Sequence, residues 1–208
     1  MTAQRFTILA LAIVLAALIL LSGCAGAPTV PEHRYLLGLT SRPAAPAASS
    51  EHRLWIASLQ LAPFLRSDGI VMQTNDVAIH QGRDHLWAEN LATQLRRSLR
   101  EELARKLPRV QVLDDSESAT TGEPLPRLEV EVDGFHGRYD GVAIVVGQWR
   151  LRDGTGRLLA ARQFSVERPL PADGYQALVE SLAAAWRGVA DQIAPVVGGE
   201  LIAAGHSQ

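Results

Sequence analysis

The sequence has only one cysteine, Cys24, and this scarcity excludes several kinds of site. A single cysteine forms no disulfide within the chain and supplies no zinc site that needs two or more thiolates. The six histidines are scattered, without an H-E-x-x-H pattern or a paired spacing. The residues therefore favour no metal centre and no cofactor, and the folded state must rely on its hydrophobic core.

A surplus of basic charge is also lacking. The formal net charge is −2 at pH 7, and the sequence contains no polybasic patch. Nucleic-acid binding and charge-driven membrane binding both need a basic surface, because each neutralises phosphate groups. We therefore expect no nucleic acid among the partners of this chain.

Signatures of catalysis are missing as well. The sequence has no G-x-S-x-G motif, and the glycines of residues 154–156 lie between two predicted strands, where they are typical of a hairpin turn. Glu129, Glu131 and Asp133 alternate with apolar residues, which indicates the wet face of an antiparallel sheet better than a pair of catalytic carboxylates. We predict that the chain is not an enzyme. An enzyme would show a convergent cluster of polar groups in the structure.

One apolar run is present, from residue 6 to residue 21, and it ends in Leu21-Ser22-Gly23-Cys24. The run follows a short start that carries Arg5, and it is shorter than the roughly 20 apolar residues of a comfortable transmembrane helix. The small-small-Cys ending resembles a bacterial lipobox, in which the thiol receives a diacylglycerol and the cysteine becomes the new N-terminus. An ordinary signal peptide or a single anchor helix are the alternatives, but the lipobox also explains why an exported chain keeps one cysteine.

These features divide the chain into four predicted parts. Residues 1–23 are a lipoprotein signal peptide, and residues 24–33 are a lipidated tether that reaches about 30 Å when extended. Residues 34–198 form one domain, and residues 199–208 are a tail. The only prosthetic groups we expect are the diacylglycerol and the N-acyl chain on the cysteine.

The pattern of apolar residues predicts an α/β fold with two long helices and a mixed, largely antiparallel sheet. A stripe at every fourth residue predicts a helix from about residue 85 to residue 107 with Asp84 as its N-cap. A second stripe predicts a helix from residue 173 to a stop at Pro195, and residues 114–127 are predicted to form a loop. The predicted strands cover residues 35–39, 54–61, 70–74, 77–81, 110–113, 128–135, 142–152 and 157–167.

One loop stands out after the strand that ends near residue 61. Pro63, Phe64, Leu65 and Arg66 place two large apolar groups beside the turn signal of residues 67–69. Two interpretations remain open at this stage. The loop packs onto the core, or it presents an apolar contact for a partner.

Several short motifs, in this order along the chain, resemble the PqiC family, which is also described as ABC-type transport auxiliary lipoproteins of MCE (mammalian cell entry) systems. After the lipobox come Tyr35-Leu36-Leu37, Pro63-Phe64-Leu65-Arg66 with Ile70-Val71, Trp87-Ala88-Glu89-Asn90-Leu91, Trp149-Arg150-Leu151 and the segment 175–179. The resemblance implies a three-layer α/β domain like the N-terminal domain of TolB. It also implies an outer-membrane lipoprotein that faces the periplasm.

The same resemblance implies a function and partners. The chain would dock an MCE-domain membrane protein that forms a tunnel for lipids or hydrophobic compounds, and would support the integrity of the membrane. Its other partners would be outer-membrane lipids, and a homo-oligomer stays open. The alternative from another class is a periplasmic lipoprotein that binds a lipid or small ligand in its own enclosed cavity.

Overall fold

The computed structural model describes residues 31–38 and 50–205. The chain divides into two units, Met1–Pro31 and Glu32–Gln208, and the fold below is that of the second unit. The expected signal peptide and most of the tether lie outside the described residues. Among the described residues, no helix has the length and apolar character needed to cross a membrane.

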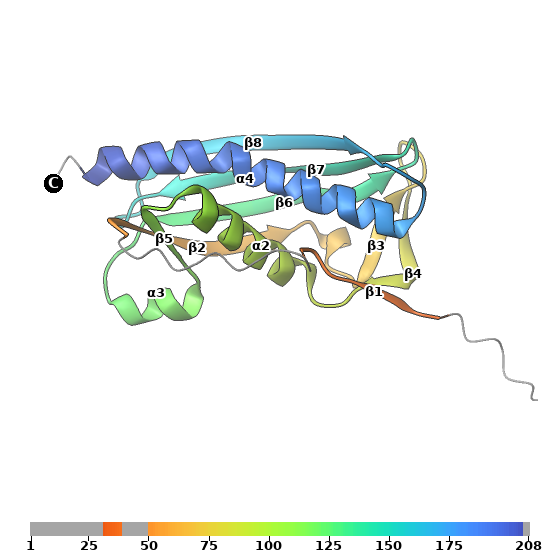
Figure 1. Cartoon of the computed structure of the whole chain (residues 1–208), viewed down its shortest axis with the longest axis horizontal. Helices are drawn as coiled ribbons and strands as arrows, with labels where there is room; N and C mark the ends of the chain where they lie inside the picture. The colour runs from red at the N-terminus through yellow and green to blue at the C-terminus, as the bar shows by residue number, and fades with distance from the viewer. Residues whose placement is uncertain (1–30, 39–49, 206–208) are drawn as a thin grey trace, which may run out of the picture. The chain divides into compact units, whose positions relative to one another are not determined.

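One mixed sheet of eight strands forms the frame of the domain (Figure 1). The strands follow the order β1-β4-β3-β6-β2-β5, and β7 and β8 continue from β6 as a second branch. Their bounds are His33–Tyr35 (β1), His52–Leu61 (β2), Gly69–Gln73 (β3), Ile79–Trp87 (β4), Val110–Leu113 (β5), Arg127–Arg138 (β6), Val142–Arg152 (β7) and Leu158–Pro169 (β8).

The sheet has more parallel pairings than the sequence indicated. The β1–β4, β2–β5, β2–β6 and β3–β6 pairings are parallel, and the β3–β4, β6–β7 and β7–β8 pairings are antiparallel. The expectation of a largely antiparallel sheet is therefore not confirmed. The three antiparallel pairs are hairpins, which a local pattern predicts, whereas each parallel pair joins strands far apart in the sequence.

The domain has two layers rather than the expected three. Helix α2 (Leu91–Lys106) contacts β2 and β5, helix α4 (Tyr175–Gly205) contacts β7 and β8, and the two helices contact each other. Figure 1 shows both helices on the same side of the sheet. The opposite face of the sheet carries charged and polar side chains, so among the described residues no second layer of long helices covers it.

Helix α2 starts later than the sequence predicted. Asn90 caps it, and its side-chain oxygen accepts a hydrogen bond from the N–H of Thr93 at 3.3 Å. Asp84 lies within β4, and the N–H of Trp87 donates to the carbonyl of Asp68 at 2.7 Å, so both residues are extended. The apolar spacing happens to continue back to Trp87. Pairing with β1 and β3 overrides that local preference.

Two further boundaries differ from the sequence-based ones. A short helix, α3 (Asp115–Thr121), replaces part of the expected loop, because Asp114 and Glu117 form a reciprocal capping box. Helix α4 runs through Pro195 to Gly205, so the predicted stop at Pro195 is wrong. Most of the residues assigned to a C-terminal tail therefore continue this helix.

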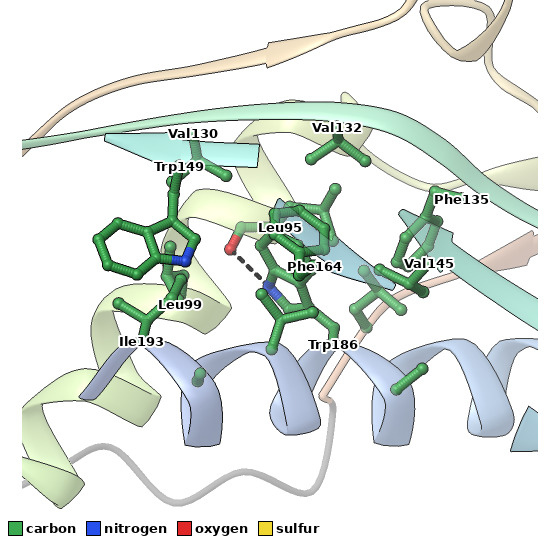
Figure 2. Close-up of a cluster of buried hydrophobic side chains, with 14 of the residues drawn as sticks. Leu95, Leu99, Val130, Val132, Phe135, Val145, Trp149, Phe164, Trp186 and Ile193 are labelled. Atoms are coloured by element: carbon green, nitrogen blue, oxygen red, sulfur yellow. Dashed lines mark hydrogen bonds between the residues drawn. The ribbon is translucent and has the colours of Figure 1, made fainter. Parts of the chain in front are cut away.

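Aromatic side chains fill the space between the sheet and the two helices (Figure 2). Trp186 of α4 lies edge-on to Phe135 and Phe164, with ring centroids 6.4 and 6.1 Å apart. The indole nitrogen of Trp186 donates to the carbonyl of Leu95 at 3.1 Å. Trp149 is buried beside this cluster, as the sequence indicated. The core therefore couples both helices to β6, β7 and β8.

The β7–β8 hairpin forms at the turn that the sequence predicted. Asp153 begins it, and its carboxylate accepts hydrogen bonds from the hydroxyl of Thr155 at 2.7 Å and from the backbone N–H of Arg157 at 3.0 Å. These bonds favour the charged form, led by the one from Thr155, and lower the pKa of Asp153 to about 2. The turn is thus fixed by a charged acceptor at physiological pH.

Candidate docking surface

The loop after β2 is a short 3-10 helix, η1 (Pro63–Leu65). Leu65 is only 1% exposed and belongs to the core, while Phe64 is half-buried. The ring of Phe64 meets His136 of β6 edge-on, with centroids 6.3 Å apart. Pro63 and Arg66 are exposed.

Hydrogen bonds hold this loop in place. The amide nitrogen of the Gln81 side chain donates to the carbonyl of Phe64 at 3.0 Å, and Arg66 Nε donates to the carbonyl of Leu61 at 3.2 Å. The N–H of Leu65 donates to the carbonyl of Ala62 at 3.0 Å. Core packing therefore explains why the loop carries Leu65, and it accounts for much of the burial of Phe64. Only Pro63, Arg66 and one side of Phe64 are accessible to a partner.

His136 lies under this loop and has an unusual environment. Its Nδ1 atom is buried and has no hydrogen-bond partner among the described residues. Burial disfavours the charged imidazolium, and the nearby Arg138 guanidinium adds to this effect, so both lower the pKa of His136. The side chain is therefore suited to packing in the neutral form.

The open face of the sheet is a charged surface. Glu129 accepts from Arg127 at 3.2 Å and from Arg152 at 3.3 Å, and Glu131 accepts from the amide of Gln148 at 2.8 Å. A shallow groove of about 270 Å³ lies over these residues. Each of the two carboxylates has an ion-pair or hydrogen-bond partner on β6 or β7. The two residues therefore form surface contacts along the strands rather than an acid–base pair.

A second set of ion pairs connects α2 to α3. Arg96 contacts Asp115 at 2.5 Å, and Arg100 contacts Asp114 at 3.0 Å and Glu117 at 3.5 Å. The hydrogen bond from the Ser116 hydroxyl, followed by the one from the N–H of Glu117, lowers the pKa of Asp114. These acidic residues therefore hold α3 against α2. Within residues 31–38 and 50–205, no group of three or more metal-binding side chains gathers at one place.

The hollows of the described surface are open grooves. A groove of about 450 Å³ runs between residues 34–38 and α4, and its lining combines apolar side chains with Arg34, Glu180 and Arg187. A hollow of about 370 Å³ lies between Trp55 and α3. Neither is enclosed, and of their lining residues only Val179 belongs to the buried core, so neither resembles a buried lipid cavity.

Strand β1 joins the edge of the sheet through an aromatic stack that the sequence did not indicate. The rings of His33 and His85 stack at 5.1 Å, and His85 stacks on Tyr175 of α4 at 3.9 Å. The Tyr35 hydroxyl and His85 Nδ1 form a hydrogen bond of 2.8 Å. The sequence placed His85 in a helix, so no local signal connected these four residues. The stack fixes the point at which the N-terminal segment enters the domain.

Residues 35–194 match the sequence profile of the ABC-type transport auxiliary lipoprotein component. The chain belongs to this family. Intermembrane transport lipoprotein PqiC from Escherichia coli (strain K12) is 33% identical over 174 residues, which cover 84% of this chain and 90% of that protein. PqiC from Shigella flexneri matches to the same extent. The family assignment makes the chain a lipoprotein and an auxiliary component of transport.

Two crystal structures resemble the domain. That of an uncharacterized protein has 32% identity and a TM-score of 0.69, and the match covers 81% of this chain and 99% of the other. That of a protein from Xanthomonas campestris has 19% identity and a TM-score of 0.62, covering 84% and 98%. The second likeness concerns the fold alone. The chain thus shares its α/β fold with both crystal structures.

The predicted lipobox residues, Leu21, Ser22, Gly23 and Cys24, lie outside both the matched range and the described residues. The motif residues after them fall within the domain, at β1, η1, β3, β4, β7 and the start of α4. Trp87 ends β4 instead of starting a helix, and it packs against Phe135 with a centroid distance of 6.0 Å. Half of the motif residues are therefore buried in the core, and the other half are partly or fully exposed.

Proposed function

We propose that the chain is an outer-membrane-anchored, periplasm-facing lipoprotein subunit of an MCE-type intermembrane transport system for lipids or hydrophobic compounds. The observation that carries this proposal is the 33% identity to intermembrane transport lipoprotein PqiC over 90% of that protein's length. The family match covers residues 35–194, which is most of the domain, so the relation is not limited to one motif.

The anchor in this proposal is a diacylglycerol and an N-acyl chain on Cys24. One acyl chain gives marginal, reversible membrane binding, whereas two or three chains hold a protein firmly. Asp directly after the lipidated cysteine tends to retain a lipoprotein at the inner membrane. Position 25 is Ala, which supports the outer membrane as the destination.

The partner in this proposal is an MCE-domain protein whose tunnel the domain docks. At the η1 loop, Pro63, Phe64 and Arg66 are the accessible residues, and the buried Leu65 acts by holding the loop on the core. The same proposal includes three further points. The chain supports membrane integrity, it assembles as a homo-oligomer, and its domain is like the N-terminal domain of TolB. The ligand-binding alternative has less support, because the hollows described above are open.

Catalysis is not part of this proposal. Glu129 and Glu131 on the open face, and Asp114 beside α3, are paired with arginine or amide groups. An auxiliary component of transport needs an anchor and a contact surface, and neither requires a reacting group.

Crosslinking in intact cells followed by purification of the tagged lipoprotein tests the docking partner. We expect an MCE-domain protein to be recovered with the wild type. Arg66→Glu reverses an exposed charge at the loop and should reduce the recovery, whereas Leu158→Ser, at the turn after β7, should leave it unchanged. Persistent failure to recover an MCE-domain protein with the wild type would refute the proposed partner.

A further inference from the structure

Exposed apolar side chains gather at one end of the sheet. Among the described residues, five large hydrophobic side chains are exposed, and three of them lie on two adjoining turns. Val77 is 96% exposed and Ile79 48% exposed, both at the β3–β4 turn, and Tyr139 is 55% exposed at the β6–β7 turn. We call these three residues the apolar tip. Isolated apolar residues on a surface are ordinary, but a group presented together indicates a contact.

Hydrogen bonds hold the apolar tip in a defined shape. The side-chain oxygen of Asn75 accepts from the N–H groups of Val77 at 3.0 Å and Ala78 at 2.9 Å. The Tyr139 hydroxyl donates to Asp76 at 2.7 Å and so connects the two turns. Figure 1 shows the β3–β4 and β6–β7 turns meeting at the same end of the sheet. Val77 is therefore held outward by the turn.

The tether before β1 is long enough to reach the same end of the domain. Strand β1 is parallel to β4, with His33 opposite His85, so the N-terminal end of β1 lies beside His85. From residue 85 to residue 77, β4 and its turn span at most about 27 Å at the spacing of a strand, because a bulge between Gln81 and Leu86 shortens the path. The nine residues that follow Cys24, up to His33, reach about 30 Å at most. A lipid on Cys24 and the apolar tip can thus meet one membrane surface.

The charged residues around the apolar tip indicate which membrane charge it can contact. Arg138 contacts Asp140 at 2.8 Å and Glu167 at 3.1 Å, and Asp76 carries a further negative charge. Arg168, opposite Ala143 on β7, adds a second guanidinium, so the three carboxylates still outnumber the two cations and the apolar tip offers no basic surplus to an anionic surface. The transfer of valine and isoleucine side chains from water to lipid lowers the free energy, and tyrosine is suited to the interface between lipid and water.

We propose that the apolar tip is a second membrane contact, in which Val77 and Ile79 enter the surface of a zwitterionic bilayer and Tyr139 lies at its headgroups. This contact rests on the lipid anchor at Cys24 that the proposed function includes. With the tip and the anchor on one surface, the domain has a fixed orientation on the membrane instead of hanging freely from its tether.

A fluorescent label tests the contact. Lipidation consumes the only cysteine, so Val77→Cys gives the lipidated full chain one free thiol for an environment-sensitive dye. Leu158→Cys is the matched control, because Leu158 is 48% exposed and lies at the opposite end of β7 and β8. Both proteins are reconstituted into vesicles of phosphatidylcholine and phosphatidylethanolamine, with and without spin-labelled acyl chains.

We expect a blue-shifted emission and quenching by the spin-labelled lipid at position 77, with neither effect at position 158. Ile79→Ser in the Val77→Cys protein should reduce the quenching. An aqueous spectrum at position 77, quenching at both positions, or a thiol that remains free at Cys24 would each overturn the proposal. The vesicles contain no transport partner. A failure of the apolar tip contact in vesicles is therefore a separate result from a failure to recover an MCE-domain protein by crosslinking in cells.

Discussion

The indole nitrogen of Trp186 donates a hydrogen bond of 3.1 Å to the backbone carbonyl of Leu95, and this bond joins the two long helices (Figure 2). Trp186 lies on α4 and Leu95 on α2, 91 residues apart in the sequence. Both side chains are buried in the layer between helices and sheet. The bond therefore fixes how the two helices lie on the one face of the sheet that they cover.

Trp186→Phe tests this bond. The variant keeps most of the aromatic packing but removes the donor, so we expect the free energy of unfolding to fall by about 1–2 kcal/mol. Trp186→Ala also leaves a cavity and should lower it by about 3–5 kcal/mol. Urea unfolding followed by circular dichroism measures both changes. In the control, Trp149→Phe, the indole nitrogen donates to no described residue, so a fall as large as that of Trp186→Phe would contradict the role of the bond.

Gly147 lies at a close approach between strands. A Cβ at this position would collide with the carbonyl oxygen of Glu131 and with the ring of Phe164. We expect Gly147→Ala to lower the free energy of unfolding by about 1–3 kcal/mol, because the sheet must move to accept the methyl group. Thermal and urea unfolding check this value, and an unchanged midpoint would show that the β6–β7 spacing is wrong.

Gly199→Ala tests the part of α4 that lies beyond Pro195. No atom lies within 4 Å of a Cβ built at Gly199, and the residue is helical. Alanine in place of a helical glycine should raise the free energy of unfolding by about 0.5–1 kcal/mol. The measurement is the urea midpoint. A neutral or lowered value would indicate that the helix ends at Pro195 after all.

His136 should make stability depend on pH. Because burial lowers its pKa, the folded state holds its proton less tightly than the unfolded state, whose pKa is about 6.5. The stabilising contribution is therefore fully present above pH 6.5 and is lost as the pH falls from there through the lower, folded-state pKa. We expect the free energy of unfolding to decrease from pH 7.5 to pH 5.

His136→Leu is the variant that isolates this contribution, since it keeps an apolar contact for Phe64 and cannot titrate. Urea unfolding at pH 7.5, 6.5 and 5.5 should show a flatter pH dependence for His136→Leu than for the wild type. Parallel curves for the two proteins would assign the pH dependence to other groups.

Local patterns predicted the elements that depend on neighbours in the sequence. The β7–β8 hairpin and strand β5 form where the apolar alternation and turn residues placed them, and β3 and β4 form a hairpin as predicted, although β4 covers Ile79–Trp87 instead of residues 77–81. The predicted apolar stripe of α2 is correct from Leu91 onward, and Trp149 is a core residue as predicted. The capping box of Asp114 and Glu117 was also present in the sequence, and it was overlooked inside an acidic segment.

The parts that could not be predicted depend on distant contacts. The parallel β2–β6 and β1–β4 pairings, the stack of His33, His85 and Tyr175, and the single helical layer have no local signal. For the candidate site, the sequence identified residues 63–66 but could not show that Leu65 is buried while Arg66 is exposed. That distinction needs the position of β6 beneath the loop.

Cys24→Ala tests the anchor in cells. The substitution lies outside the domain, so the fold and the unfolding midpoint should not change. We expect the variant to be lost from the outer-membrane fraction, because the thiol that would carry the lipid is gone. Thr29→Ala changes the same tether and should stay in that fraction. If Cys24→Ala fractionates like Thr29→Ala, the lipid on Cys24 is not the anchor.

The most direct measurement of the central claim is the mass of the N-terminal peptide of the protein isolated from membranes. The account predicts that the chain starts at Cys24 and that this residue carries a diacylglycerol and an N-acyl chain. A chain that starts at any other residue, or a Cys24 with a free thiol, would contradict it.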